Sequence, residues 1–123
     1  MDENLKKKLA KDPNGLMTYE YIANNIGLLD DIMPELVSNI IAVDKTGQFT
    51  VSAARYLHAI DKDKYAECID SLIKAAIEKD RERNYLADLI AGIWGEDYKN
   101  HVEEYITDDN FRRIYKRLFP VGI

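Results

Sequence analysis

The chain has 123 residues, of which 46% are hydrophobic and 32% charged, and its formal net charge is −5. This length suits one globular domain with its own core, and the mixture is not that of a disordered chain. The acidic balance argues against general binding to nucleic acids or anionic membranes. The single cysteine, Cys68, rules out an internal disulfide framework and a cysteine-rich zinc site.

No segment approaches the roughly 18 apolar residues that a membrane-spanning helix requires. The start, MDENLKKKLAKD, has a basic run with no apolar stretch behind it, unlike a signal peptide. We therefore expect a single cytoplasmic domain over residues 1–123, with no cofactor and no membrane contact. The oligomeric state stays open.

The first half of the chain predicts four helices. Residues 2–11 form a short polar helix that the turn sequence DPNG stops. Thr18 caps a helix that ends near Leu28. Asp30 or Asp31 opens the next one, with Pro34 in its first turn and DKTGQ as its end. Thr50 or Ser52 caps the fourth.

The second half predicts four more helices. Asp61 or Asp63 opens the longest, which runs to about Arg81. The segments NYLADLIAGIW and EDYKNHVEEYI follow, separated at Gly95. The last helix, DNFRRIYKRLF, stops at Pro120. Throughout, apolar residues recur every three or four positions, which is the period of a helix face and predicts an all-α fold.

Two of these blocks resemble each other. IDKDKYAECIDSLI, residues 60–73, matches IWGEDYKNHVEEYI, residues 93–106, when the chain is shifted by 33. The shift superimposes four apolar pairs: Ile60 with Ile93, Tyr65 with Tyr98, Ile69 with Val102, and Ile73 with Ile106. We expect a helical hairpin of about 33 residues, present about three times over residues 18–106 and stacked into one core. In such a stack Tyr65 and Tyr98 should be buried at equivalent positions on parallel helices, and Ile69 and Val102 should both be core residues. An N-terminal helix and turn, 1–15, and a capping helix, 108–119, complete the stack. A plain helical bundle is the alternative.

The hairpin pattern over about residues 18–119 resembles the short helical-hairpin repeat proteins of the HEAT-like and TPR-like kind. The resemblance lies in period and pattern, because the TPR order of Trp, Leu-Gly, Tyr and a later Pro is absent. The ankyrin TPLH opening is absent too, and HEAT repeats usually run longer than 33 residues. The resemblance implies a scaffold that binds other macromolecules along one face, and it assigns no catalytic residues.

No known catalytic or nucleotide-binding motif occurs in the chain. Cys68 and His101 occupy matching positions in the two blocks, but no third group would orient a Cys/His pair, and two His with one Cys make a poor metal set. We therefore expect a non-enzymatic protein that binds another protein, and the size and acidity of the chain fit an inhibitor or immunity-type protein. A small helical enzyme is an alternative.

The candidate partner-binding residues lie near the C-terminus. Trp94 either covers a hairpin joint or serves as a binding anchor. Acidic residues crowd 96–109, among them Glu103 and Glu104, and form either a solvated helix face or a surface for a basic partner. Opposite the apolar stripe of the last helix lie four basic residues: Arg112, Arg113, Lys116 and Arg117. Nucleic-acid association, or mimicry of nucleic acid, through this region is the other alternative.

Overall fold

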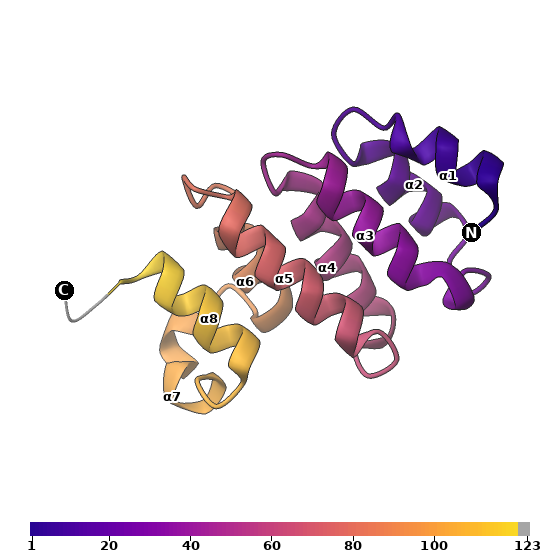
Figure 1. Cartoon of the computed structure of the whole chain (residues 1–123). Helices are drawn as coiled ribbons and strands as arrows, with labels where there is room; N and C mark the ends of the chain where they lie inside the picture. The colour runs from indigo at the N-terminus through magenta and orange to yellow at the C-terminus, as the bar shows by residue number, and fades with distance from the viewer. Residues whose placement is uncertain (121–123) are drawn as a thin grey trace.

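The computed structural model describes residues 1–120, and these residues form helices and turns with no strand. The all-α fold predicted from the sequence is therefore confirmed (Figure 1). The helices are α1 (Glu3–Ala10), α2 (Leu16–Asn24), α3 (Met33–Val43), α4 (Gln48–Asp61), α5 (Ala66–Lys79), α6 (Leu86–Trp94), α7 (Val102–Tyr105) and α8 (Asp109–Leu118). Two short 3-10 helices, η1 (Asp30–Ile32) and η2 (Tyr98–His101), precede α3 and α7.

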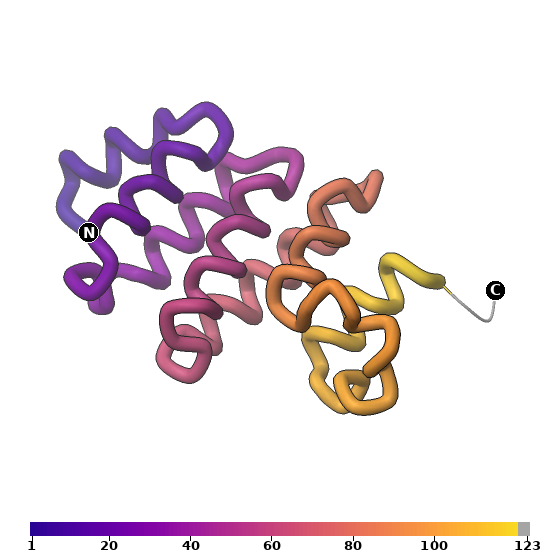
Figure 2. Tube along the Cα trace, turned by 180° about the vertical axis from the view of Figure 1, so that it is seen from behind, coloured from indigo at the N-terminus to yellow at the C-terminus, as the bar shows by residue number. Residues whose placement is uncertain are grey.

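The helices lie in two rows (Figures 1 and 2). The first row contains α1, α3, α5 and α8, and each of these packs against the next. The second row contains α2, α4 and α6, which pack against one another in the same order. The helices α1 and α8 lie at opposite ends of this elongated molecule.

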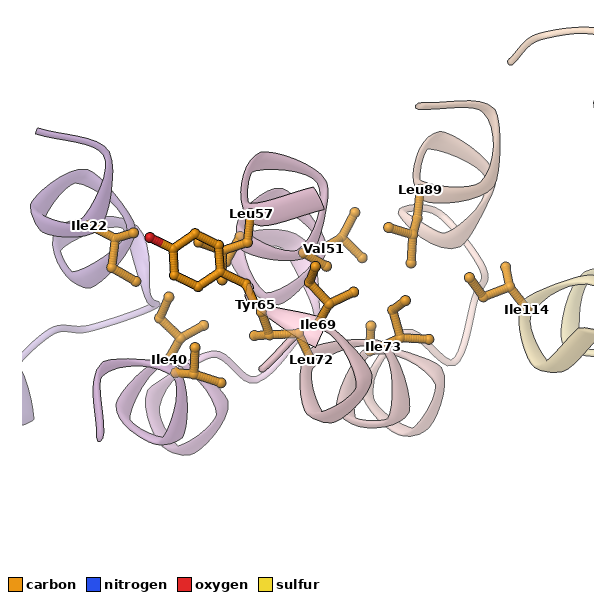
Figure 3. Close-up of a cluster of buried hydrophobic side chains, with 14 of the residues drawn as sticks. Ile22, Ile40, Val51, Leu57, Tyr65, Ile69, Leu72, Ile73, Leu89 and Ile114 are labelled. Carbon is orange, nitrogen blue, oxygen red and sulfur yellow. The ribbon is translucent and has the colours of Figure 1, made fainter. Parts of the chain in front are cut away.

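The core lies between the two rows, as Figure 3 shows. From above come Ile22, Leu57 and Leu89 of the second row, and from below come residues of α3 and α5. The α3 and α5 stripes have the same spacing of three and four residues, which places their members on one helix face. The buried members are Met33, Leu36, Val37 and Ile40 in α3 and Ile69, Leu72, Ile73 and Ala76 in α5.

A buried aspartate organises the sharp corner between α3 and α4. Asp44 is 1% exposed, and its carboxylate accepts the backbone N–H groups of Gly47 at 3.0 Å and Thr50 at 2.8 Å. The Thr50 hydroxyl donates to the same carboxylate at 2.8 Å. The carboxylate thus satisfies donors that the start of α4 would otherwise leave without a partner.

The same arrangement occurs at two other corners. Asp12 accepts the N–H groups of Gly15 and Thr18 between α1 and α2. Asp80 accepts the N–H groups of Tyr85 and Leu86 between α5 and α6. Asp12 and Asp80 are 4% and 3% exposed. Each aspartate is thus buried and holds the first turn of a helix of the second row.

Neighbouring corners fit closely against one another, and glycine makes this possible. Gly15 and Gly47 each stand three residues after the corner aspartate, with φ of 102° and 93°. A Cβ on Gly15 would lie 3.3 Å from the Cβ of Asp44, and one on Gly47 would lie 3.4 Å from the Cβ of Asp80. At the third corner the corresponding residue is Arg83, with φ of 63°. The left-handed backbone is kept there without glycine.

The register of the corners differs from the shift of 33 found in the sequence. Asp44 follows Asp12 by 32 residues, and Asp80 follows Asp44 by 36. The shift of 33 and the Asp44–Asp80 spacing of 36 differ by three residues, which is close to one helical turn of 3.6 residues. Both alignments therefore superimpose the same apolar face. The sequence shift therefore pairs α4 residues with α6 partners one turn away from those that the corner aspartates indicate.

Several helix boundaries differ from those predicted. Thr18 and Thr50 do not cap their helices: each lies in the first turn and is fully buried, while Gly15 and Gly47 hold the N-cap positions. The helix expected to begin at Asp61 or Asp63 begins at Ala66 instead. Because it has 14 residues, as α4 does, it is not the longest helix.

The segment 96–106 is not one helix, because η2 and α7 divide it. Tyr65 and Tyr98 are both buried, at 4% and 7% exposure, as expected. They do not lie at equivalent positions on parallel α-helices, because Tyr65 is the N-cap residue of α5 and Tyr98 lies in the 3-10 helix η2. Ile69 is buried, but Val102 is only half-buried, so the expectation that both are core residues is wrong for Val102.

The last helix packs back on the chain as predicted. Phe111 and Ile114 of α8 are fully buried against α6 and also against α5, a contact that was not expected. The Phe111 ring contacts Tyr98 and Tyr105 with centroid distances of 6.3 Å and 5.5 Å. Residues 121–123, which the single-domain prediction includes, lie outside the described residues.

Candidate functional site

A shallow groove crosses the outer side of the second row. Its volume is about 360 Å³. One lining residue comes from α2, four come from α4 and one comes from α6: Tyr19, Ser52, Arg55, Tyr56, Ala59 and Gly92. We call this surface the helix-row groove. The corner aspartates position it, because each fixes the first turn of one of these three helices.

Two tyrosines form the α2 side of the groove. The rings of Tyr19 and Tyr56 meet edge to face, with centroids 6.2 Å apart. The Tyr56 hydroxyl donates to the backbone carbonyl of Ala23 at 3.4 Å. Both rings are half-buried. Packed aromatic rings of this kind present apolar surface at little further cost in side-chain entropy.

The α6 side of the groove is the contact between Arg55 and Gly92. The Arg55 guanidinium lies over the Gly92 backbone so closely that a Cβ on Gly92 would be 2.8 Å from its Cζ. Glycine inside a helix costs about 1 kcal/mol relative to alanine. In α6 the glycine stands where the Arg55 guanidinium approaches the helix, and a larger residue would prevent this approach.

Two exposed apolar side chains share a helix face with the groove tyrosines. Leu16 is 41% exposed and lies on the same face of α2 as Tyr19, three residues away. Ile60 is 47% exposed and follows Tyr56 by four residues on α4. These faces therefore carry apolar side chains beyond those that line the groove.

Trp94, the first of the residues predicted from the sequence, is largely a packing residue. It ends α6, is half-buried, and meets the ring of Phe111 edge to face at a centroid distance of 5.2 Å. Gly95, with φ of 103°, turns the chain directly after it, as expected. The Trp94 ring therefore joins the aromatic cluster that holds α8 in place.

The basic residues of α8 differ in their surroundings. Arg112 pairs with Asp109 and donates to the Ile106 carbonyl at 3.4 Å, and Arg113 donates to the side chain of Asn110 at 3.1 Å. Both are half-buried, whereas the expectation was that all four basic residues lie in water. Lys116 is exposed, and Arg117 is half-buried.

The acidic candidates lie on a different surface from the groove. Glu103 and Glu104 are exposed on α7, and a Glu104 oxygen is 3.6 Å from Nδ1 of His101. His101 also lies 3.1 Å from an Asp97 oxygen. This C-terminal region brings Trp94 close to α8 through Phe111, and Glu103 and Glu104 line a hollow together with Tyr115 of α8.

The chemistry of Cys68 gives it little nucleophilic character. Burial, and next the nearby Glu67 carboxylate, raise the pKa of the Cys68 thiol. A raised pKa lowers the fraction of reactive thiolate at neutral pH. The hydrogen bond of His101 goes to Asp97 and not to Cys68. Among residues 1–120 no cluster of three His, Cys, Asp or Glu side chains could hold a metal ion.

No helix within the described part of the chain has the length and apolar character needed to cross a bilayer.

A comparison of the chain with protein-family models, curated proteins and solved structures gives no match.

The helix-row groove was missed by reasoning from sequence because its residues come from three helices. Tyr19, Arg55 and Gly92 are each more than 30 positions apart in the sequence. One signal was present: Gly92 interrupts the apolar helix LADLIAGIW, and a glycine inside a helix often marks a close approach of another group. The residue that approaches, Arg55, could not be identified without the register of α4 against α6.

Proposed function

We propose that this chain is a non-enzymatic protein–protein interaction module that binds a segment of another protein in the helix-row groove. In this proposal α1–α2, α3–α4 and α5–α6 are three stacked hairpins, similar in kind to helical-hairpin repeats, and α8 closes the stack. This pairing differs by one helix from the hairpins expected over residues 18–106, in which α1 was an additional N-terminal helix. The supporting observation is that three neighbouring helices of the second row contribute to one surface that bears half-buried tyrosines, with exposed Leu16 and Ile60 on the same helix faces.

The composition of the groove favours a protein partner. Tyrosine and arginine are enriched among the residues that dominate binding energy at protein interfaces. Exposed apolar side chains such as Leu16 and Ile60 add area that a partner would remove from water. The small residues Ser52 and Ala59 leave space between the tyrosines and Arg55.

The dimensions favour an extended segment. Neighbouring helices in a row are about 10 Å apart, so three helices span about 20 Å. An extended chain advances about 3.3 Å per residue, so about six residues would cross the row. Stacked hairpins commonly bind partners along such a continuous row.

A crosslinking experiment tests the proposal. A photo-reactive residue is placed at Ala59 in the groove and, as the matched control, at Ser71, which is exposed on α5. Each full-length protein is irradiated in an extract of the cells it comes from. The crosslinked protein is then made pure, and its Kd for the unmodified chain is measured. We expect a partner that crosslinks from Ala59 and not from Ser71.

Two variants check the same surface. Ser52→Gln/Ala59→Gln fills the groove with neutral side chains and should weaken binding of the purified partner at least about tenfold. Ser71→Gln should leave the Kd unchanged. Crosslinking from Ser71 alone, or an unchanged Kd for the groove variant, would contradict the proposal.

A further inference from the structure

We infer that the segment bound in the helix-row groove carries an aspartate or glutamate side chain, and that Arg55 is its anchor. This inference rests on the proposed function and specifies the chemistry of its ligand. It starts from the position of Arg55, an exposed residue on α4 whose guanidinium lies over the backbone of α6.

Arg55 is not neutralised within the chain. None of the ion pairs among residues 1–120 includes it. It is also the single charged residue among those that line the groove. The groove therefore carries a positive charge on a protein whose net charge is −5. A complementary segment would bring a negative charge to this point.

The contact with Gly92 places the guanidinium at the α6 side of the groove. Its Nη2 lies 3.0 Å from where a Gly92 Cβ would stand, so the group occupies space that a side chain at position 92 would fill. A guanidinium at this point can donate two parallel hydrogen bonds to a carboxylate of the bound segment.

A carboxylate fits this site better than a phosphate. A phosphorylated side chain carries about two negative charges at neutral pH and is usually met by a cluster of arginines. The groove offers one cation, and its other lining residues are tyrosines and small residues. One carboxylate balances one guanidinium, and apolar neighbours in the segment can contact Tyr19 and Tyr56.

Display of random peptides against the full-length chain tests the inference. The selected peptide is synthesised in two forms, one with its acidic residue and one with the matching amide, Asn or Gln. We expect one acidic position to recur among the selected peptides. Amide replacement and Arg55→Ala should each weaken binding at least about tenfold, and together they should weaken it little more than either change alone.

Two further variants separate charge from position. Gly92→Ala keeps the positive charge but forces the Arg55 side chain to move. It should therefore weaken binding of the acidic peptide and leave binding of the amide peptide unchanged. Arg55→Glu should reject the acidic peptide and accept one with lysine at the same position. Arg81→Glu, at an exposed corner residue, is the charge control. It should leave the Kd of the acidic peptide and of the amide peptide unchanged apart from a small long-range charge effect.

The outcomes distinguish the inference from the proposed function. Selected peptides that lose affinity for Ser52→Gln/Ala59→Gln but show no acidic preference, or bind Arg55→Glu unchanged, overturn the inference and leave the groove as the binding surface. Peptides that bind Ser52→Gln/Ala59→Gln as well as the natural chain, or the absence of any selected peptide, would contradict both.

Discussion

The substitution Asp44→Ala removes the carboxylate around which the corner between α3 and α4 is folded. Its oxygens accept four backbone N–H groups, those of Thr46, Gly47 and Phe49 at 3.0 Å and that of Thr50 at 2.8 Å. The bonds to Gly47 and Thr50 are buried, so water cannot replace the missing acceptor there. The variant therefore leaves three buried donors without this acceptor: the N–H groups of Gly47 and Thr50 and the Thr50 hydroxyl.

Each buried donor left without a partner costs about 1–3 kcal/mol, so we expect Asp44→Ala to lower the free energy of unfolding by about 3–5 kcal/mol. This is a large fraction of the roughly 5–15 kcal/mol that stabilises a typical domain. Asp108→Ala is the matched control. Asp108 caps α8 with an exposed carboxylate, and its loss should cost about 1 kcal/mol.

Urea unfolding followed by circular dichroism measures both variants, with the slope checked for two-state behaviour. If Asp44→Ala does not fold, Asp44→Asn, which keeps one acceptor oxygen, should fold with an intermediate loss. The reasoning fails if Asp44→Ala costs no more than Asp108→Ala, because the buried bonds would then contribute no more than an exposed cap.

Four other outcomes are expected. Arg83→Gly should raise the free energy of unfolding by about 0.5–1 kcal/mol in urea, since Arg83 has φ of 63° and glycine adopts this conformation without strain; a loss would show that its side chain stabilises the corner. Burial raises the pKa of Asp12, but hydrogen bonds from the Thr18 hydroxyl and from backbone N–H groups outweigh it and lower the pKa overall. The bonds of Asp12 therefore stabilise the fold fully above its unfolded pKa of about 3.9, and the stabilisation is lost as pH falls through the lower folded value. The free energy of unfolding, measured between pH 7 and pH 3, should depend less on pH in Asp12→Asn than in the natural chain. An equal pH dependence in the two proteins would contradict this. Ile69→Ala, at 3% exposure, should cost about 2–4 kcal/mol in urea, and a midpoint equal to the natural chain would refute its place in the core. Deletion of residues 108–123 should uncover the apolar surface under Phe111 and cause aggregation in light scattering, whereas a monomer that melts at the same temperature would make α8 dispensable.

The all-α fold was predictable because helix periodicity is a local property of the sequence. The apolar stripes of α3 and α5 indicate their buried faces directly, and Phe111 and Ile114 do the same for α8. The helix starts were less predictable. Thr18 and Thr50 resemble N-caps in the sequence, but their hydroxyls donate to an aspartate six residues earlier. A capping rule that looks only at adjacent residues does not detect such a bond.

The break within residues 96–106 was not predictable from periodicity, since the apolar spacing continues through it. In the structure Tyr98 is buried in the short η2, and α7 has 4 residues. The aromatic contacts of Phe111 with Tyr98 and Tyr105 draw this segment toward α8. Tertiary packing thus overrides the local pattern, just as the meeting of Arg55 and Gly92 depends on how α4 packs against α6.

The placement of α1 and α8 at opposite ends of the rows has a mechanical consequence. Each helix of a row packs on its neighbour, while α8 packs on α5 and α6. A small change of angle at each helix contact would therefore add to the next along the rows. Bending toward the second row would narrow the helix-row groove, and bending away from it would widen the groove.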